Sequence, residues 1–171
     1  VQSSFAENVM YEEPKFTFPL VCEANRIGIF DEIISHIRIH SENTMGSGRN
    51  NRHRLLEHPK VQLQLLFWLK QYPEKYHTLW KEIEFYFVST FYLETVIFSV
   101  NECKPLSAYD YEWLRMVVLS EIPDWKNNPY LMYDIRIQTI LNNLTISFIK
   151  NPAALTEYCH EIKRMFSDKT T

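Results

Sequence analysis

The sequence predicts a mainly α-helical fold, with about five helices behind a short irregular or extended N-terminal segment. Apolar residues make up 46% of the 171 residues, and only 3 of the residues are glycine. From about residue 60 onwards the apolar residues recur at helical spacing. The prolines fall between these periodic stretches, where helices begin or end. A chain of this length and composition can bury a substantial core.

The N-terminal stretch is expected to hold little regular structure. Pro14 and Pro19 argue against long elements before position 19, and a short helix is expected to follow and to end within 25–28. Residues 33–40 alternate apolar and polar side chains in their second half, which predicts a short strand. A polar, solvent-facing loop that contains two of the three glycines is predicted over 41–54.

Residues 55–171 are expected to form a helical domain, and residues 1–54 a separate unit. One helix is predicted from Lys60 to the Tyr72-Pro73 step, and a second, starting at Pro73 and ending before Pro105, is predicted to form the core. The remaining predicted elements are three helices and a two-proline corner: 109–119, the corner at 122–131, 133–149 and 152–166.

Charge and cysteine content restrict the partners and the compartment. The formal net charge of -3, from 18 basic and 21 acidic residues, gives no field that favours nucleic acid, so none is expected as a partner. Cys22, Cys103 and Cys159 lack metal-ligand or CxxC spacing and indicate reduced thiols in the cytoplasm. The apolar run 85–100 carries Glu94 and is shorter than a membrane span, so a buried helix is expected there. Peripheral contact with the inner face of the membrane stays open.

Three N-terminal motifs resemble the second half of bacterial family 2 glycosyltransferases, whose catalytic domain has the GT-A fold. The motifs are Phe5-x-Glu7-Asn8-x-Met10-Tyr11-Glu12-Glu13, then Ala24-Asn25-Arg26-Ile27 with Asp31-Glu32, and finally Ile37-Arg38-Ile39-His40-x-x-Asn43-Thr44-Met45. The later Pro123-x-Trp125-x-x-Asn128-x-Tyr130-Leu131 corner resembles the helical tails of some capsule and cell-wall members.

The chain departs from the family pattern in several places. Glu13 stands where the family usually has Asp, and Ile37 and Thr44 replace its usual Tyr and Ser. No nucleotide-binding βαβ unit and no Asp-x-Asp pair is present, and the first residues lack an initiator Met. The resemblance therefore implies a C-terminal portion of the enzyme, with residues 1–54 as a remnant of the catalytic domain, inactive as an isolated fragment.

The resemblance assigns a role to each site residue. Glu13 is the expected catalytic base that takes a proton from the acceptor hydroxyl, with Glu12 beside it. Arg38, His40 and Thr44 are expected to bind the donor diphosphate, and His40 is also the expected metal ligand. The full-length parent would use Mn²⁺ or Mg²⁺ and would transfer a sugar from a nucleotide sugar to a polysaccharide or cell-envelope acceptor.

Simpler interpretations of the same residues stay open. Glu12 and Glu13 also fit an exposed acidic pair at the start of a helix, and Arg38 and His40 fit the wet face of an edge strand. The alternative function is a stand-alone helical ligand-binding or dimerisation domain, such as the sensing half of a transcriptional regulator. A homo-oligomer is compatible with either function.

Overall fold

The computed structural model describes residues 13–29, 31, 32, 36, 52–101 and 106–133, together with the single positions 157, 160 and 164. Regular structure in these residues is helical and includes no strand, so the predicted mainly α fold is confirmed for them. The strand predicted over 33–40 lies outside the described residues except for His36, which is exposed and in no regular element. The two helices predicted after residue 133 lie almost entirely outside them.

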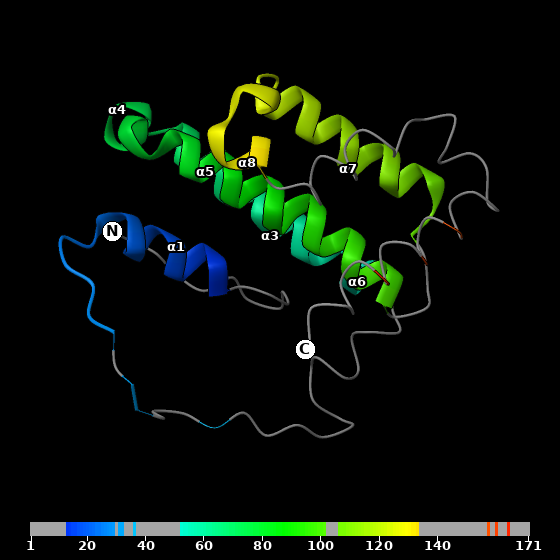
Figure 1. Cartoon of the computed structure of the whole chain (residues 1–171), viewed down its shortest axis with the longest axis horizontal. Helices are drawn as coiled ribbons and strands as arrows, with labels where there is room; N and C mark the ends of the chain where they lie inside the picture. Colours follow the sequence, from blue (N-terminus) through cyan, green and yellow to red (C-terminus); the bar gives the residue numbers. More distant parts are fainter. Residues whose placement is uncertain are drawn as a thin grey trace.

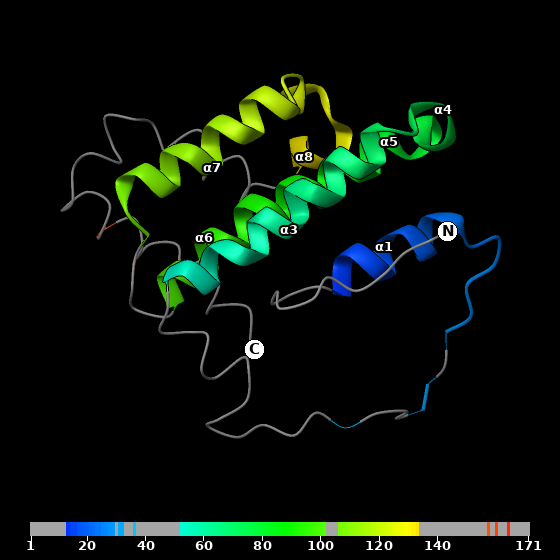
Figure 2. The ribbon, with the colours of Figure 1, turned by 180° about the vertical axis from the view of Figure 1, so that it is seen from behind.

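The described helices stack in three layers (Figure 1; Figure 2). The middle layer consists of α3 packed along the continuous run α5, η2 and α6, while α1 lies on one side of this layer and α7 on the other. In chain order the elements are α1 (Glu13–Glu23), α3 (Arg52–Lys70), α4 (Pro73–Tyr76), the 3-10 turn η1 (His77–Leu79), α5 (Trp80–Phe87), the π-helix η2 (Val88–Glu94), α6 (Thr95–Asn101), α7 (Ala108–Glu121), the 3-10 turn η3 (Trp125–Asn127) and α8 (Pro129–Tyr133).

The core lies between the middle layer and α7. Its side chains are almost entirely aliphatic or aromatic, and they are buried. Fully buried members of this core are Leu65, Leu66, Leu69, Tyr76, Ile83, Phe91, Tyr92, Tyr111, Leu114, Ile122 and Leu131. Burial of this apolar area drives the helices together, because each helix alone would expose its apolar face.

The first helix starts earlier than the prolines suggested. α1 begins at Glu13 rather than after position 19, and it contains both Pro14 and Pro19. Pro14 lies in the first turn, where its missing N–H would have no helical partner in any case. Pro19 lies inside the helix and is buried, so packing offsets the hydrogen bond that its ring removes. The short helix expected after position 19 is therefore present, but it begins earlier than expected.

The loop predicted over 41–54 ends before the predicted boundary. α3 already begins at Arg52, and it continues through Pro59 to Lys70. Its C-terminus agrees with the prediction, because Gln71 and Tyr72 donate backbone hydrogen bonds to the last turn before Pro73. The remainder of the predicted loop lies outside the described residues.

The segment after Pro73 is not the single α-helix that its apolar pattern predicted. It passes through α4, η1 and α5 and then widens into the π-helix η2 before α6. η2 buries Val88, Thr90, Phe91, Tyr92 and Leu93, five of its seven residues. A regular α-helix would turn some of these outwards, so the π geometry suits a segment that is apolar on nearly every side.

The last described elements match the prediction closely. α7 runs from Ala108 to Glu121 and opens with a capping box in which Ser107 and Asp110 satisfy each other's backbone N–H groups. The predicted two-proline corner contains η3 and leads into α8. Asn128 holds this corner in place, since its buried side chain donates to the Lys81 carbonyl and to Glu84, at 2.8 and 2.9 Å.

Candidate functional site

Only one of the predicted site residues lies in the described part of the chain. Glu13 is the first residue of α1, and its side chain is exposed. Its carbonyl accepts a hydrogen bond from the Thr17 hydroxyl at 2.8 Å. Glu12, Arg38, His40 and Thr44 lie outside the described residues, so their roles stay predictions.

The opposite end of α1 is tied to the helical body. Glu23 forms an ion pair with Lys75 of α4, and the Tyr76 hydroxyl donates to the same carboxylate oxygen at 3.0 Å. These two hydrogen bonds lower the pKa of Glu23 below its usual 4.5. Along the helix, Phe18 stacks on Tyr86 of α5 with ring centroids 4.2 Å apart. The base candidate Glu13 therefore opens a helix that is held at two points.

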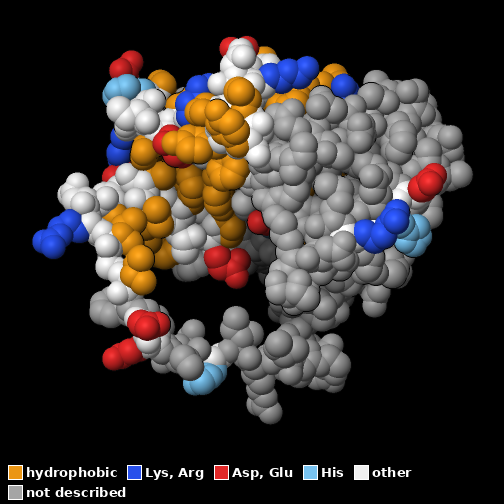
Figure 3. Space-filling model, in the orientation of Figure 1, with side chains coloured by type: hydrophobic (Ala, Val, Ile, Leu, Met, Phe, Trp, Pro, Cys, Tyr) orange, Lys and Arg blue, Asp and Glu red, His pale blue; other side chains and the backbone are white. Residues whose placement is uncertain are grey.

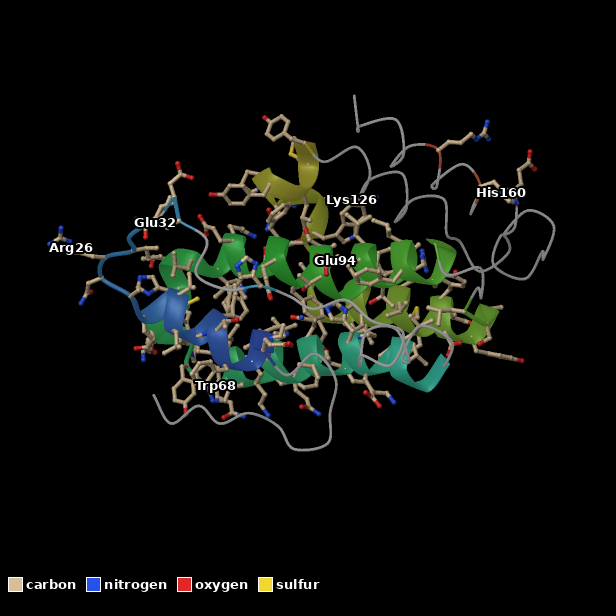
Figure 4. The ribbon with its side chains drawn as sticks, turned by 90° about the horizontal axis from the view of Figure 1, so that it is seen from below. Arg26, Glu32, Trp68, Glu94, Lys126 and His160 are labelled. Carbon is tan, nitrogen blue, oxygen red and sulfur yellow. The ribbon has the colours of Figure 1, made fainter. Side chains whose placement is uncertain are left out.

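α1 and the chain that follows it present apolar side chains to solvent. Leu20 is 44% exposed, Val21 56%, Ile27 67% and Ile29 96%. Hydrophobic side chains gather over this part of the visible face (Figure 3). Figure 4 shows Arg26 on the same extended segment, pointing away from the helices. This surface (Leu20, Val21, Ile27 and Ile29) is called the α1 patch below, and such an apolar surface is typical of an interface.

A second cluster of polar groups lies in the middle layer, between α3 and η2. His58 is buried on α3, and its Nε2 lies 3.7 Å from Oε2 of Glu94, the last residue of η2. The amide Nε2 of Gln62, one turn further along α3, lies 3.4 Å from the same ring nitrogen. The Phe98 ring meets the imidazole edge to face, with centroids 6.2 Å apart.

Burial controls the protonation of this cluster. Loss of solvent lowers the pKa of His58 from its usual 6.5 to about 4 and raises the pKa of Glu94 above its usual 4.5. An ionised Glu94 at 3.7 Å would pull the histidine pKa upwards instead. Burial outweighs this attraction, because the histidine side chain is 8% exposed while the glutamate is 47% exposed and therefore screened by water. At neutral pH the imidazole is uncharged.

The Gln62 amide connects this cluster to a small cavity. Its side chain is 1% exposed and hydrogen-bonds the Tyr86 hydroxyl, whereas Oε1 has no hydrogen-bond partner. The adjoining cavity between α3 and α5 measures about 10 Å³ and is lined by Gln62, Tyr86, Phe87 and aliphatic side chains. That volume is about what one water molecule needs.

The sequence carries a signal for this cluster that lies outside the motifs described above. Glu94 was noted only as a charge inside an apolar run, and a lone carboxylate in such a run needs a partner or solvent access. His58 and Gln62 stand four residues apart, which places them on one face of a helix. The contact between His58 and Glu94 depends on the packing of α3 against η2, which cannot be predicted from the local sequence pattern.

None of the described helices is both long and apolar enough to span a lipid bilayer. Within the described residues, no three His, Cys, Asp or Glu side chains form a group that could hold a metal ion. Comparison of the chain with protein-family models, curated proteins and solved structures found no match in any of the three.

Proposed function

We propose that this chain is the acceptor-side portion of a nucleotide-sugar-dependent glycosyltransferase of the bacterial family 2 type. The three N-terminal motifs that resemble that family support the proposal. The single structural observation that carries it is the position of Glu13 at the exposed start of α1, whose far end is anchored by Glu23.

The chemistry of the proposal begins with the acceptor hydroxyl. In an inverting transfer one carboxylate takes the hydroxyl proton while the oxygen attacks the anomeric carbon, and the nucleoside diphosphate leaves. Glu13 supplies this carboxylate from an anchored helix, so that its position relative to the acceptor is well defined. Arg38, His40 and Thr44 stabilise the diphosphate, with Mn²⁺ or Mg²⁺ in the full-length parent.

The α1 patch adds indirect support. Four apolar side chains in succession along α1 and the following extended segment are exposed in this chain. In the proposed enzyme the nucleotide-binding half covers them, which removes this apolar area from water. The cytoplasm, with or without contact at the inner face of the membrane, is where nucleotide sugars would be used.

The test compares two glutamates that occupy equivalent positions. Glu13 and Glu74 are both exposed and both lie in the first turn of a helix. In the complete product of the parent gene, Glu13→Gln should lower the rate of sugar transfer by about 100-fold or more and leave the donor KM unchanged. Glu74→Gln should transfer at the parental rate. An unchanged rate in Glu13→Gln would refute the assignment of the base.

Nucleotide-sugar binding tests the wider proposal. Calorimetric titration of UDP-sugars with Mn²⁺ or Mg²⁺ should detect binding to the complete product and none to residues 1–171 alone. An absence of binding to both would overturn the glycosyltransferase proposal. It would leave the stand-alone helical domain as the better account.

The alternative function includes two kinds of domain, a ligand-sensing domain and a dimerisation domain, and they need different structural features. A sensing domain needs a ligand pocket of roughly 300 Å³ or more. The cavity beside Gln62, at about 10 Å³, is far below that size. A dimerisation domain needs an exposed apolar surface, and the α1 patch provides one. Sedimentation of residues 1–171 separates the two accounts, because a dimer that Val21→Ser dissociates favours dimerisation.

A further inference from the structure

The outer face of α7 carries apolar side chains where a helix on the outside of a fold usually carries polar ones. α7 forms an outer layer, on the opposite side of the middle layer from α1 (Figure 1; Figure 2). Tyr109 is 80% exposed and Met116 is 50% exposed, and both lie on the side of the helix turned away from the buried Leu114. An outward apolar face of this kind is typical of a helix that packs against a partner.

Four residues follow one another along this outer face at spacings of three, four and three positions. They are Tyr109, Glu112, Met116 and Leu119, and this face is called the α7 stripe below. At 3.6 residues per turn, such spacing keeps the side chains on one side of the helix. The same alternation of three and four residues brings helices together in coiled coils. Glu112 and Leu119 are half-buried, so the stripe is an apolar strip with one carboxylate in it.

Two opposite charges on this side of α7 have no partner. Within the described residues, neither Glu112 nor Arg115 forms an ion pair or a side-chain hydrogen bond, although the two lie three positions apart on the same helix. Arg115 is half-buried, and its Nε is buried without a hydrogen-bond partner. An unpaired guanidinium in such surroundings is costly, and a carboxylate beside it would offset that cost.

From this arrangement we infer that the α7 stripe is an interface between two copies of this chain, packed antiparallel about a two-fold axis at the level of Leu114. Such an axis brings residues that are equally far from position 114, on opposite sides of it, to the same level. Tyr109 of one copy therefore lies opposite Leu119 of the other, and the apolar ends of the two stripes cover each other.

The same axis pairs the two charges. Glu112 stands two residues before position 114 and Arg115 one residue after it, so Glu112 of one copy and Arg115 of the other differ in level by about 1.5 Å. With about 100° of rotation per residue, both lie on the same flank of the stripe. The two-fold axis keeps that flank on one side of the interface, so Glu112 and Arg115 meet twice. A parallel pairing would place each Glu112 opposite its own counterpart instead.

This interface is independent of the proposed transfer chemistry. Glu13 and the α1 patch belong to α1 and the chain after it, on the other side of the middle layer. Two copies can therefore pair through α7 while the α1 patch is covered by another part of the parent protein. Each copy contributes one helix of 14 residues, which is a small contact for a specific interface, so the dimer should dissociate in the micromolar range.

Sedimentation equilibrium of the 171-residue chain, from micromolar to millimolar concentration, tests the interface. The chain should show a monomer–dimer equilibrium, and Tyr109→Ser and Met116→Ser should each weaken the dimer by about 10-fold or more. Tyr133→Ser is the matched control for Tyr109→Ser, because Tyr133 is 82% exposed on α8, outside the stripe. A chain that stays monomeric throughout would overturn the inference, and so would a dimer that only Val21→Ser, in the α1 patch, dissociates.

Charge reversal then tests the antiparallel pairing. Glu112→Arg and Arg115→Glu each place like charges opposite one another, so each variant alone should weaken the dimer by about 10-fold or more. An equimolar mixture of the two variants should dimerise again, because both contacts in the mixed dimer then join opposite charges. Damage to the fold of either variant would not produce this recovery. Wild-type dimerisation of both single variants, or a mixture that stays monomeric, would refute the pairing.

Discussion

Acidification should destabilise this fold through one buried side chain, His58. The unfolded chain takes up a proton on this residue near its usual pKa of 6.5, whereas the folded chain resists protonation until about 4. Between these values the unfolded state binds more protons, so stability must fall as the pH falls. For this pair of pKa values, the free energy of unfolding drops by about 2 kcal/mol between pH 7 and pH 5.

Glu94 acts in the opposite direction over part of the same range. Its folded pKa lies above the usual 4.5, so the folded state holds the extra proton there and gains stability as the pH falls. The Glu94→Gln variant loses this compensation and should therefore show a steeper acid-side loss than the wild type. His58→Gln should show the reverse, with about 2 kcal/mol less loss between pH 7 and pH 5.

Urea unfolding followed by tryptophan fluorescence at pH 7, 6 and 5 measures these differences in the free energy of unfolding. His77→Gln, at an exposed ring, serves as the control and should follow the wild-type pH dependence. The reasoning fails if His58→Gln loses as much stability on acidification as the wild type does. It also fails if Glu94→Gln shows the shallower curve.

Three further changes should alter stability by amounts that follow from single contacts. Asn128→Ala removes four hydrogen bonds from a fully buried side chain and should cost about 2–3 kcal/mol in urea unfolding, whereas the exposed Asn127→Ala should stay within about 0.5 kcal/mol of the wild type. Ser107→Ala removes the cap of α7 and should cost about 1 kcal/mol, measured against Ser120→Ala on the exposed end of the same helix. Tyr111→Phe removes the buried 2.8 Å hydrogen bond between the Tyr111 and Ser99 hydroxyls and should lower the midpoint of thermal unfolding. An unchanged midpoint would show that this hydrogen bond contributes no net stability.

The parts of the fold that the sequence predicted well are those with unambiguous local signals. Pro73 and the residue before it ended α3 as expected, and the serine and aspartate of the capping box started α7 within two residues of the prediction. The confirmed helical class follows from the spacing of apolar residues. Each of these signals acts within a single turn of chain.

The errors arose where tertiary packing overrode a local rule. Pro19 was expected to oppose a helix, yet it lies buried inside α1, and Pro59 lies buried inside α3 in the same way. The π-helix η2 was predicted as ordinary α-helix, because apolar periodicity records that a segment is buried but not how wide its turns are. For the same reason the pairing of His58 with Glu94 was not foreseen. The acidic pair and the Arg38, His40 and Thr44 set remain predictions of the sequence alone.

The anchor at Glu23 also bears on the order in which the molecule assembles. Its two contacts, with Lys75 and Tyr76, join residues 52 and 53 positions apart in the chain. By contrast, the middle layer is built by α3 and the run from α5 to α6, which follow one another closely. Closing a long loop costs chain entropy before any contact repays it, so short-range helices form first. α1 then docks on a surface that already exists, and Glu13 takes its position last.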